Sequence, residues 1–182
     1  MTITPAMPIA QVNYLHRDAR LHDLPRIVEI YNSTIASREV TADTEPVSLE
    51  SRLAWFAEHN PQRRPLWVIH AANDKGADRA ILGWISYSNF YGRPAYSGTA
   101  ELSIYIAEEW RGKGLGRYCL EQSIEFAPRI ALHTLLGFIF GHNAASLALF
   151  DKFGFARWAT LPRVASLDGV ERDLIILGKR VA

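Results

Sequence analysis

Apolar residues recur along this chain with two different periods. Runs rich in β-branched and aromatic residues indicate strands, whereas apolar residues three and four positions apart indicate helices. The expected strands span residues 12–16, 66–72, 80–89, 99–106, 134–140, 155–160 and 174–178. The expected helices begin at residues 23, 48, 115 and 144 and end near residues 35, 60, 128 and 152. Asp23 stands where a capping residue is expected, and turns are expected at 73–78 and 168–169.

The order of these segments predicts a single α/β domain. One strand is followed by two helices and a hairpin, and then by strand, helix, strand, helix and a terminal strand pair. Such an order favours a central mixed sheet with helices packed on it. No linker rich in proline, glycine or serine divides the chain. We therefore expect a tail over residues 1–11 and one domain over residues 12–182.

Composition narrows the possible partners. The 182 residues are 48% apolar and 21% charged, as in an ordinary globular domain, and the longest apolar run is far too short to span a bilayer. A net charge of +1 gives no reason to expect a nucleic acid or a membrane as partner. The single cysteine, Cys119, excludes an internal disulfide and a cysteine-based zinc site, and we expect no metal. The lone cysteine and the lack of a signal-peptide pattern favour the cytoplasm.

A glycine-rich segment follows the expected strand at residues 99–106. It reads Arg111-Gly112-Lys113-Gly114-Leu115-Gly116, and Arg117 continues into a helix. Strand, glycine-rich turn and helix together can bind an anion, because the first N–H groups of a helix lack partners and glycines let a phosphate approach. The spacing fits neither the P-loop nor the dinucleotide fingerprint. The alternative is a glycine-rich surface turn that binds nothing.

This spacing after a strand resembles the pyrophosphate loop of the GNAT-type N-acetyltransferases, which bind acetyl-CoA. The resemblance covers residues 12–178 and is strongest to the subgroup of phosphinothricin and methionine sulfone or sulfoximine acetyltransferases. The similar segments are Arg17-Asp18-Ala19, Asp23-Leu24-Pro25, Ile30-Tyr31-Asn32, Thr44-Glu45-Pro46, the positions Phe90, Arg93, Tyr96, Thr99 and Glu101, Asn143-Ala144-Ala145-Ser146, and Phe153-Gly154-Phe155.

The resemblance implies a fold and a set of residues for acetyl-CoA. The fold is a single-domain GNAT-like α/β fold with a central mixed, mostly antiparallel sheet flanked by helices. Pantetheine is expected beside the backbone of Ile104, Tyr105 and Ile106. The remaining expected contacts are Arg111, Gly112, Lys113, Gly114, Leu115, Gly116, Arg117, Asn143 and Ser146. For Asn143 and Ser146 a second interpretation stays open, because asparagine is a favoured helix cap and serine bonds readily within a first turn.

Acetyl transfer from a thioester to an amine needs a neutral amine, a stabilised oxyanion and a departing thiolate. Amines titrate well above neutral pH, so a general base helps. The resemblance implies Glu101 in that role, and partial burial would raise the pKa of its carboxyl. The alternative is a strand carboxylate paired with a surface base. A backbone N–H in the segment 104–106 would polarise the thioester carbonyl.

One position departs from the superfamily pattern. Many members carry a tyrosine, acting as general acid to the thiolate, four residues before the Gly-Phe pair that is Gly154-Phe155 here. Phe150 occupies that position and has no proton to donate. A thiol with a pKa of about 8.5 is a tolerable leaving group unaided. Water or another group is the alternative proton source, and His142 is a weak candidate.

The residues expected to contact the acceptor are Tyr31, Phe90, Arg93 and Tyr96. Arginine binds a carboxylate through two parallel hydrogen bonds, so Arg93 points to an amino acid whose α-amine lies near Glu101. The alternative for Arg93 is a solvated loop cation. The whole pattern predicts an N-acetyltransferase for a small amino-acid-like amine, and the subgroup implies a homodimer.

Two other functions stay open. One is acetylation of another amine, such as a polyamine, a peptide or a protein N-terminus. Residues 88–98 contain no carboxylate, which disfavours a polyamine. The other is a CoA-binding module without turnover, which Phe150 allows and Glu101 disfavours.

Overall fold

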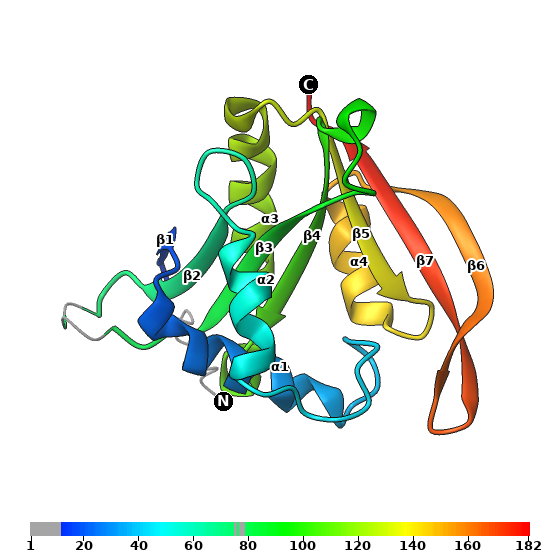
Figure 1. The fold of residues 1–182 in the computed structure, drawn as a ribbon, viewed down its shortest axis with the longest axis horizontal. Coiled ribbons are helices and arrows are strands. Elements are labelled where there is room, and N and C mark those ends of the chain that lie inside the picture. Colours follow the sequence, from blue (N-terminus) through cyan, green and yellow to red (C-terminus); the bar gives the residue numbers. More distant parts are fainter. Residues whose placement is uncertain (1–11, 75, 77–78) are drawn as a thin grey trace, which may run out of the picture.

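The computed structural model describes residues 12–74, 76 and 79–182, so the expected tail and part of the turn at 73–78 lie outside the described residues. Seven strands form one mixed sheet in the order β1-β2-β3-β4-β5-β7-β6 (Figure 1). Only β4 and β5 are parallel among these neighbours. The strands are β1 Tyr14–Asp18, β2 Leu66–Ala71, β3 Gly83–Asn89, β4 Thr99–Ile106, β5 Thr134–Phe140, β6 Ala156–Leu167 and β7 Val170–Arg180. The expected fold class is confirmed.

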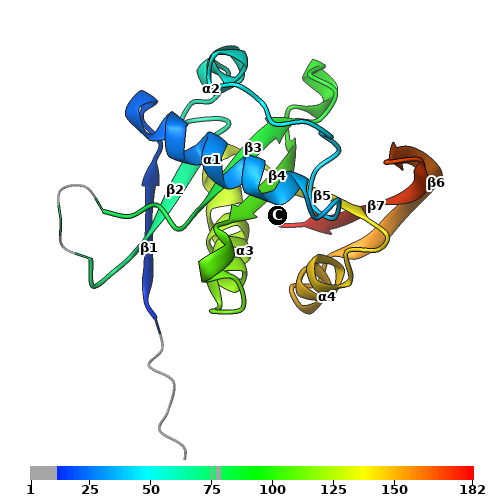
Figure 2. The ribbon, with the colours of Figure 1, turned by 90° about the horizontal axis from the view of Figure 1, so that it is seen from below.

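Helices cover both faces of the sheet, and Figure 2 shows α1 and α2 on one face and α3 and α4 on the other. They span Leu24–Ile35, Leu53–Ala57, Leu115–Phe126 and Ala144–Lys152. Side chains alternate across each strand, so one sheet feeds two cores. Trp84 of β3 packs with the core under α1, whereas its neighbour Ile85 packs with the core under α3.

Several boundaries differ from the sequence-based expectation. β1 lies two residues further along than expected, and β3 begins at Gly83, three residues later. The larger difference is at the C-terminus, where β6 and β7 form one long hairpin. Most side chains of β6 are exposed, and Pro162 interrupts its apolar pattern. A register shift between Leu161 and Ala165 accommodates the proline, as is typical of bulged edge strands.

The second helical segment is shorter than predicted and starts with a tighter turn. Ser48 does open it, since its Oγ accepts a hydrogen bond from the Ser51 N–H at 3.1 Å. A 3₁₀ turn, Glu50–Arg52, follows, and α2 then runs only to Ala57. This geometry places Arg52 at the start of α2.

Asp23 does not cap α1 as expected, because its side chain bonds in the other direction. Its carboxylate accepts two hydrogen bonds from the Arg17 guanidinium, at 2.7 and 2.8 Å, and one from the Arg20 N–H at 2.7 Å. Burial alone would raise the pKa of this carboxyl, but the bonds from Arg17 and Arg20 outweigh it and hold the pKa below its ordinary value. The pair ties β1 to the start of α1.

Neither a membrane span nor a metal-binding group is found in the described residues. No helix in residues 12–74 and 79–182 is both long and apolar enough to cross a membrane. Within the same residues, no three His, Cys, Asp or Glu side chains gather as metal ligands would.

Replacing Asp23 with alanine should destabilise the protein through the loss of this buried fork. Hydrogen bonds to charged groups contribute about 1.5–3 kcal/mol, and about 1 kcal/mol shifts the melting temperature of a domain of this size by roughly 2–4 °C. Thermal unfolding followed by circular dichroism should therefore show a Tm lower by about 4–10 °C at neutral pH.

The pH dependence of this difference follows from the lowered pKa of Asp23. The stabilisation is present above the unfolded pKa of about 3.9 and is lost as pH falls through the folded value, so the Tm gap should close in acid. Glu125→Ala is the matched control, because it breaks the exposed Glu125–Arg129 pair and should cost under about 1 kcal/mol. Equal losses in the two variants would contradict the prediction.

Candidate active site

β4 and β5 share a short parallel ladder and then separate. Residues 99–101 pair with residues 134–136, and the recorded pairing ends there. Figure 1 shows the two strands together at one end and apart at the other. A cleft of about 460 Å³ opens between residues 101–106 of β4 and residues 138–140 of β5. Because β3 pairs with the opposite edge of β4, the backbone facing the cleft keeps N–H and C=O groups for a ligand.

The three residues predicted to flank pantetheine all lie on this cleft. Ile104, Tyr105 and Ile106 line it, directly before the chain turns into the glycine-rich loop. Of the predicted loop residues, Gly116 also lines the cleft.

The glycine-rich loop leads into α3 with an open surface. Gly112 and Gly114 have φ of 69° and 86°, and Gly114 is the N-cap residue of α3. A Cβ added at either glycine would meet no atom within 4 Å, so the backbone there is accessible. The Tyr14 hydroxyl of β1 donates a hydrogen bond to the Lys113 carbonyl at 2.7 Å, which ties the loop to the edge strand β1. The Lys113 ammonium lies 4.8 Å from the ring centre of Trp110.

At three predicted loop positions the residue type is explained by contacts within the protein. Leu115 is buried in the core under α3. Gly116 allows α4 to approach, since a Cβ there would stand 2.9 Å from a methyl group of Leu149. Arg117 forms an exposed ion pair with Glu121 at 2.8 Å. Their backbone N–H groups belong to the first turn of α3, which is where a helix has unpaired donors.

Asn143 and Ser146 line the cleft at the start of α4. The Asn143 Oδ1 accepts the Ser146 N–H at 3.0 Å, so the predicted helix cap is confirmed. Its Nδ2 donates to the Glu39 carbonyl at 3.1 Å, which holds the α1–α2 connection against α4. A contact with the co-substrate stays a prediction for both residues.

Glu101 lies on the wall of the cleft, at the last position where β4 pairs with β5. It stands opposite Ser88 of β3, and no ion pair or hydrogen bond to its carboxylate is recorded within the described residues. Burial raises the pKa of this carboxyl, in the direction expected from the sequence. A carboxylate whose pKa is raised is a stronger base, as a proton acceptor in catalysis needs to be.

Phe150 lines the same cleft and is buried. Its ring fills the space left by Gly137 of β5, where an added Cβ would stand 2.6 Å from a ring carbon, and it packs on Phe155. The weaker candidate His142 places its Nε2 2.8 Å from the Arg38 carbonyl oxygen. Its ring is thus engaged with the backbone of the α1–α2 connection.

The predicted acceptor residues fall in two separate places. Tyr31 lines a second cavity, described below. Phe90, Arg93 and Tyr96 lie on the segment between β3 and β4, where Phe90 packs edge-on against Tyr96 and where Arg93 and Tyr96 are exposed. These three residues line neither the cleft nor the second cavity, so their role in acceptor binding stays a prediction.

The second cavity, of about 130 Å³, lies between α1, α2 and the face of β3 and β4 that carries Glu101. Sequence reasoning missed most of it and named only Tyr31 and Tyr105 among its lining residues. The available signal was the alternation of Trp84, Ser86 and Ser88 with apolar Ile85 and Tyr87 along β3. The lining residues are Ile27, Val28, Tyr31, Val47, Arg52, Trp55, Trp84, Ser86, Ser88, Ser103 and Tyr105.

Comparisons with known proteins agree with this geometry. Residues 15–156 match the family described as "Acetyltransferase (GNAT) domain". A Bacillus subtilis protein named "Putative phosphinothricin acetyltransferase YwnH" is 51% identical over 166 residues, which cover 91% of this chain and 98% of that protein. The L-methionine sulfoximine/L-methionine sulfone acetyltransferase of Pseudomonas aeruginosa is 35% identical over 161 residues, covering 88% of this chain and 91% of that protein.

Solved structures give the same result. A phosphinothricin acetyltransferase from Sinorhizobium meliloti in complex with AcCoA superposes with a TM-score of 0.82 at 26% identity, covering 92% of this chain and 88% of the other. A crystal structure named as a "putative phosphinothricin N-acetyltransferase" reaches a TM-score of 0.87 at 49% identity, covering 93% and 99%. The splayed strands, the glycine-rich loop and these matches together show that the chain belongs to the GNAT family and is an acetyl-CoA-dependent N-acetyltransferase.

Proposed function

We propose that this enzyme acetylates the α-amine of a small amino-acid-like acceptor of the phosphinothricin, methionine sulfone or methionine sulfoximine type, in the cytoplasm. The observation that carries the proposal is Glu101, a carboxylate on the cleft wall whose pKa is raised by burial. The names of the relatives supply the acceptor class. Glu101 then acts as the general base.

The chain's own groups supply the base and the oxyanion contact for this transfer, and solvent supplies the rest. Glu101 takes one proton from the acceptor's ammonium group, directly or through one water. The neutral amine nitrogen then bonds to the thioester carbonyl carbon, and an N–H on the open edge of β4 stabilises the oxyanion. When the C–S bond breaks, the electron pair leaves on sulfur, because Phe150 has no proton to donate, and the adduct nitrogen gives up its second proton to solvent, which leaves the neutral amide. The CoA thiolate is then protonated by solvent.

The same groups fit acetyl-CoA as co-substrate. The unpaired edge of β4 suits the amides of pantetheine, which can lie along it as an added strand. The first-turn N–H groups of α3 and the cations Arg111 and Lys113 suit the pyrophosphate.

A homodimer, expected from the resemblance, remains part of the proposal. β6 is an edge strand with exposed apolar side chains, including Trp158 and Val164 at 51% and 58% exposure, which a second copy could cover. Light scattering on the purified protein measures the molar mass directly, and a monomer at micromolar concentration would remove this part of the proposal.

Gly114→Val should weaken acetyl-CoA binding about tenfold or more, because valine is disfavoured at φ of 86° and its side chain would project where the phosphate approaches. Isothermal titration calorimetry gives the affinity. The matched control is Gly169→Val in the β6–β7 turn, which also has positive φ and open space around it. Both variants carry the same kind of backbone strain, so equal affinities would exclude a role for the loop in binding.

Glu101→Gln should lower kcat/KM for the amino acid about 10²–10⁴-fold, the usual loss when a general base is removed. Because burial raises the pKa of Glu101, the wild-type rate should fall on the acid side of its pH profile, and the variant should lack that limb. The exposed Glu58→Gln is the control. Activity of Glu101→Gln within threefold of wild type, a gap far below about 10², would end this assignment.

The same variant should be more stable than wild type at neutral pH. The pKa of Glu101 is higher in the folded than in the unfolded protein. The folded state therefore has its full stability below the unfolded pKa of about 4.3 and loses part of it as pH rises through the folded pKa and the buried carboxyl ionises. Glutamine removes that cost, so the Tm of Glu101→Gln should exceed the wild-type Tm by a few degrees near pH 7, about 2–4 °C per kcal/mol. The difference should vanish toward pH 4, and a variant that melts lower at neutral pH would contradict it.

Arg93→Ala should raise the KM for the amino acid about tenfold and leave the KM for acetyl-CoA unchanged, because a charge-assisted pair with the α-carboxylate would be lost. The methyl ester of the same amino acid removes the carboxylate instead of the arginine. If wild type acetylates ester and free acid equally well, the carboxylate is not recognised, and an amine of another class becomes the better acceptor.

A further inference from the structure

The second cavity exists because serines occupy positions of β3 and β4 where central strands usually carry large side chains. Central strands normally carry bulky side chains on a face covered by helices. Here the rings of Trp84 and Tyr105 stack with their centres 4.4 Å apart and fill one end of that face. Next to them the cross-strand pair Ser86 and Ser103 leaves a trough, and Ser86 is buried. The sequence therefore maintains an opening inside the sheet–helix interface.

This cavity adjoins the reacting centre. Ser103 and Tyr105 line both the cavity and the acetyl-CoA cleft. Ser88 lines the cavity and stands directly opposite Glu101 across the β3–β4 ladder. An acceptor whose amine lies at Glu101 can thus extend its side chain along the serines. At about 30 Å³ for a group the size of water, a cavity of about 130 Å³ has room for roughly four such groups.

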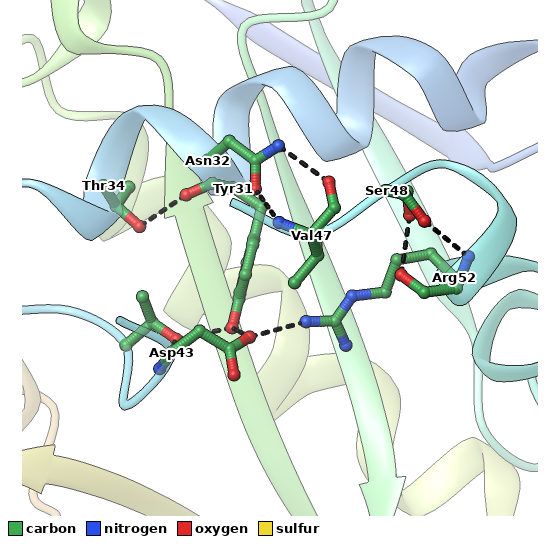
Figure 3. A network of polar contacts seen from close by, with 9 residues as sticks. Tyr31, Asn32, Thr34, Asp43, Val47, Ser48 and Arg52 are labelled. Atoms are coloured by element: carbon green, nitrogen blue, oxygen red, sulfur yellow. Dashed lines mark hydrogen bonds and ion pairs between the residues drawn. The ribbon is translucent and has the colours of Figure 1, made fainter. Parts of the chain in front are cut away.

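Arg52 lines the cavity and contacts three side chains, and Figure 3 shows two of them, Tyr31 and Asp43. Its guanidinium lies 4.7 Å from the ring centre of Tyr31 and 5.9 Å from that of Trp55. Its Nη2 donates to the Asp43 carboxylate at 2.9 Å, and the same carboxylate accepts a bond from the Tyr31 hydroxyl. Stacking and the ion pair orient the guanidinium without any contribution from a ligand.

The Arg52 guanidinium has donors left after these contacts. Arginine carries five N–H donors in a planar fork, and the bond to Asp43 is the one recorded for Arg52 with another part of the described chain. An oriented cation with spare donors on the wall of an aromatic and serine-lined cavity is suited to an uncharged or anionic group rich in oxygen. It is unsuited to a cationic side chain.

We propose that this cavity receives the side chain of the acceptor and that Arg52 selects side chains that end in a hydrogen-bond-accepting group. The inference rests on the proposed function, since it assigns the acceptor's side chain to a cavity of which the sequence analysis named only Tyr31 as an acceptor contact. It makes Arg52 a specificity-determining residue, while Glu101 remains the base. The alternative role for Arg52 is purely structural, holding the α1–α2 connection through Asp43.

L-methionine sulfone and L-methionine are the probes, because they differ only in the two sulfonyl oxygens. Wild type should prefer the sulfone. Arg52→Gln should lower kcat/KM for the sulfone about tenfold or more, as expected for a lost charge-assisted hydrogen bond, and change that for methionine less than about threefold. Arg52→Lys keeps the charge but loses the planar guanidinium, so its kcat/KM for the sulfone should lie between those of wild type and Arg52→Gln. The KM for acetyl-CoA should stay unchanged in both variants.

Two further variants separate selection from a structural role. Asp43→Asn keeps the arginine and removes its ion pair, so it should retain the preference for the sulfone, whereas a structural role predicts that it behaves like Arg52→Gln. Arg129→Gln, which removes an exposed arginine paired with Glu125, controls for loss of a positive charge.

The outcomes distinguish this inference from the proposed function. An unchanged sulfone-to-methionine ratio in Arg52→Gln, or equal losses for both amino acids, overturns the role of Arg52 while acetylation of amino acids stands. A wild-type enzyme that shows no preference for the sulfone also overturns it. Failure of wild type to acetylate any amino acid overturns the proposed function itself. Circular dichroism confirms that each variant is folded before its kinetics are compared.

Discussion

The separation of β4 from β5 is the constraint on which the rest of this structure depends. The two strands pair over only three positions, whereas β4 pairs with β3 over residues 100–106 and β5 pairs with β7 along its whole length. Each strand is therefore fixed by its outer neighbour and free at its inner edge. The free edge of β4 is a row of unpaired backbone groups in the middle of a sheet, which is costly unless a ligand pairs with it.

The elements behind the cleft keep it from closing. Gly137 in β5 admits the ring of Phe150, and Gly116 in α3 admits Leu149, so α3 and α4 meet closely under the gap. A close-packed support of this kind has few alternative arrangements. Phe150 thus has a packing role, which accounts for a large apolar residue at the position where the superfamily pattern has a tyrosine.

Two partly buried carboxylates show how the surroundings decide what a residue type does. Asp23 receives hydrogen bonds from Arg17 and Arg20, so its charge is stabilised and its pKa lowered. Glu101 has the burial without such partners, and its pKa is raised. The first arrangement stabilises the charged form of a carboxyl, and the second disfavours it and so makes the carboxylate a stronger base. The α1–α2 connection, which lines the cleft with residues 39–42, is held in place by two contacts. Asn143 donates a hydrogen bond to the Glu39 carbonyl, and Arg38 forms an ion pair with Asp168 at 2.7 Å.

The sequence by itself determined the elements whose signals are local. The apolar run of β4, the glycines of the loop and the cap at Asn143 act within a few residues, and all were predicted at or near their observed places. The terminal strand pair and its turn at 168–169 were predicted, but the full length of the β6–β7 hairpin was not, because the exposed edge strand β6 lacks an apolar alternation. Asp23 does stand at the start of α1 as predicted, but its side chain does not cap the helix, because it bonds to Arg17 of β1. Only the tertiary structure decided that Ser86, Ser88, Ser103 and Arg52 enclose one cavity beside Glu101, because a void arises from several chain segments that meet and leaves no periodic pattern in any one of them.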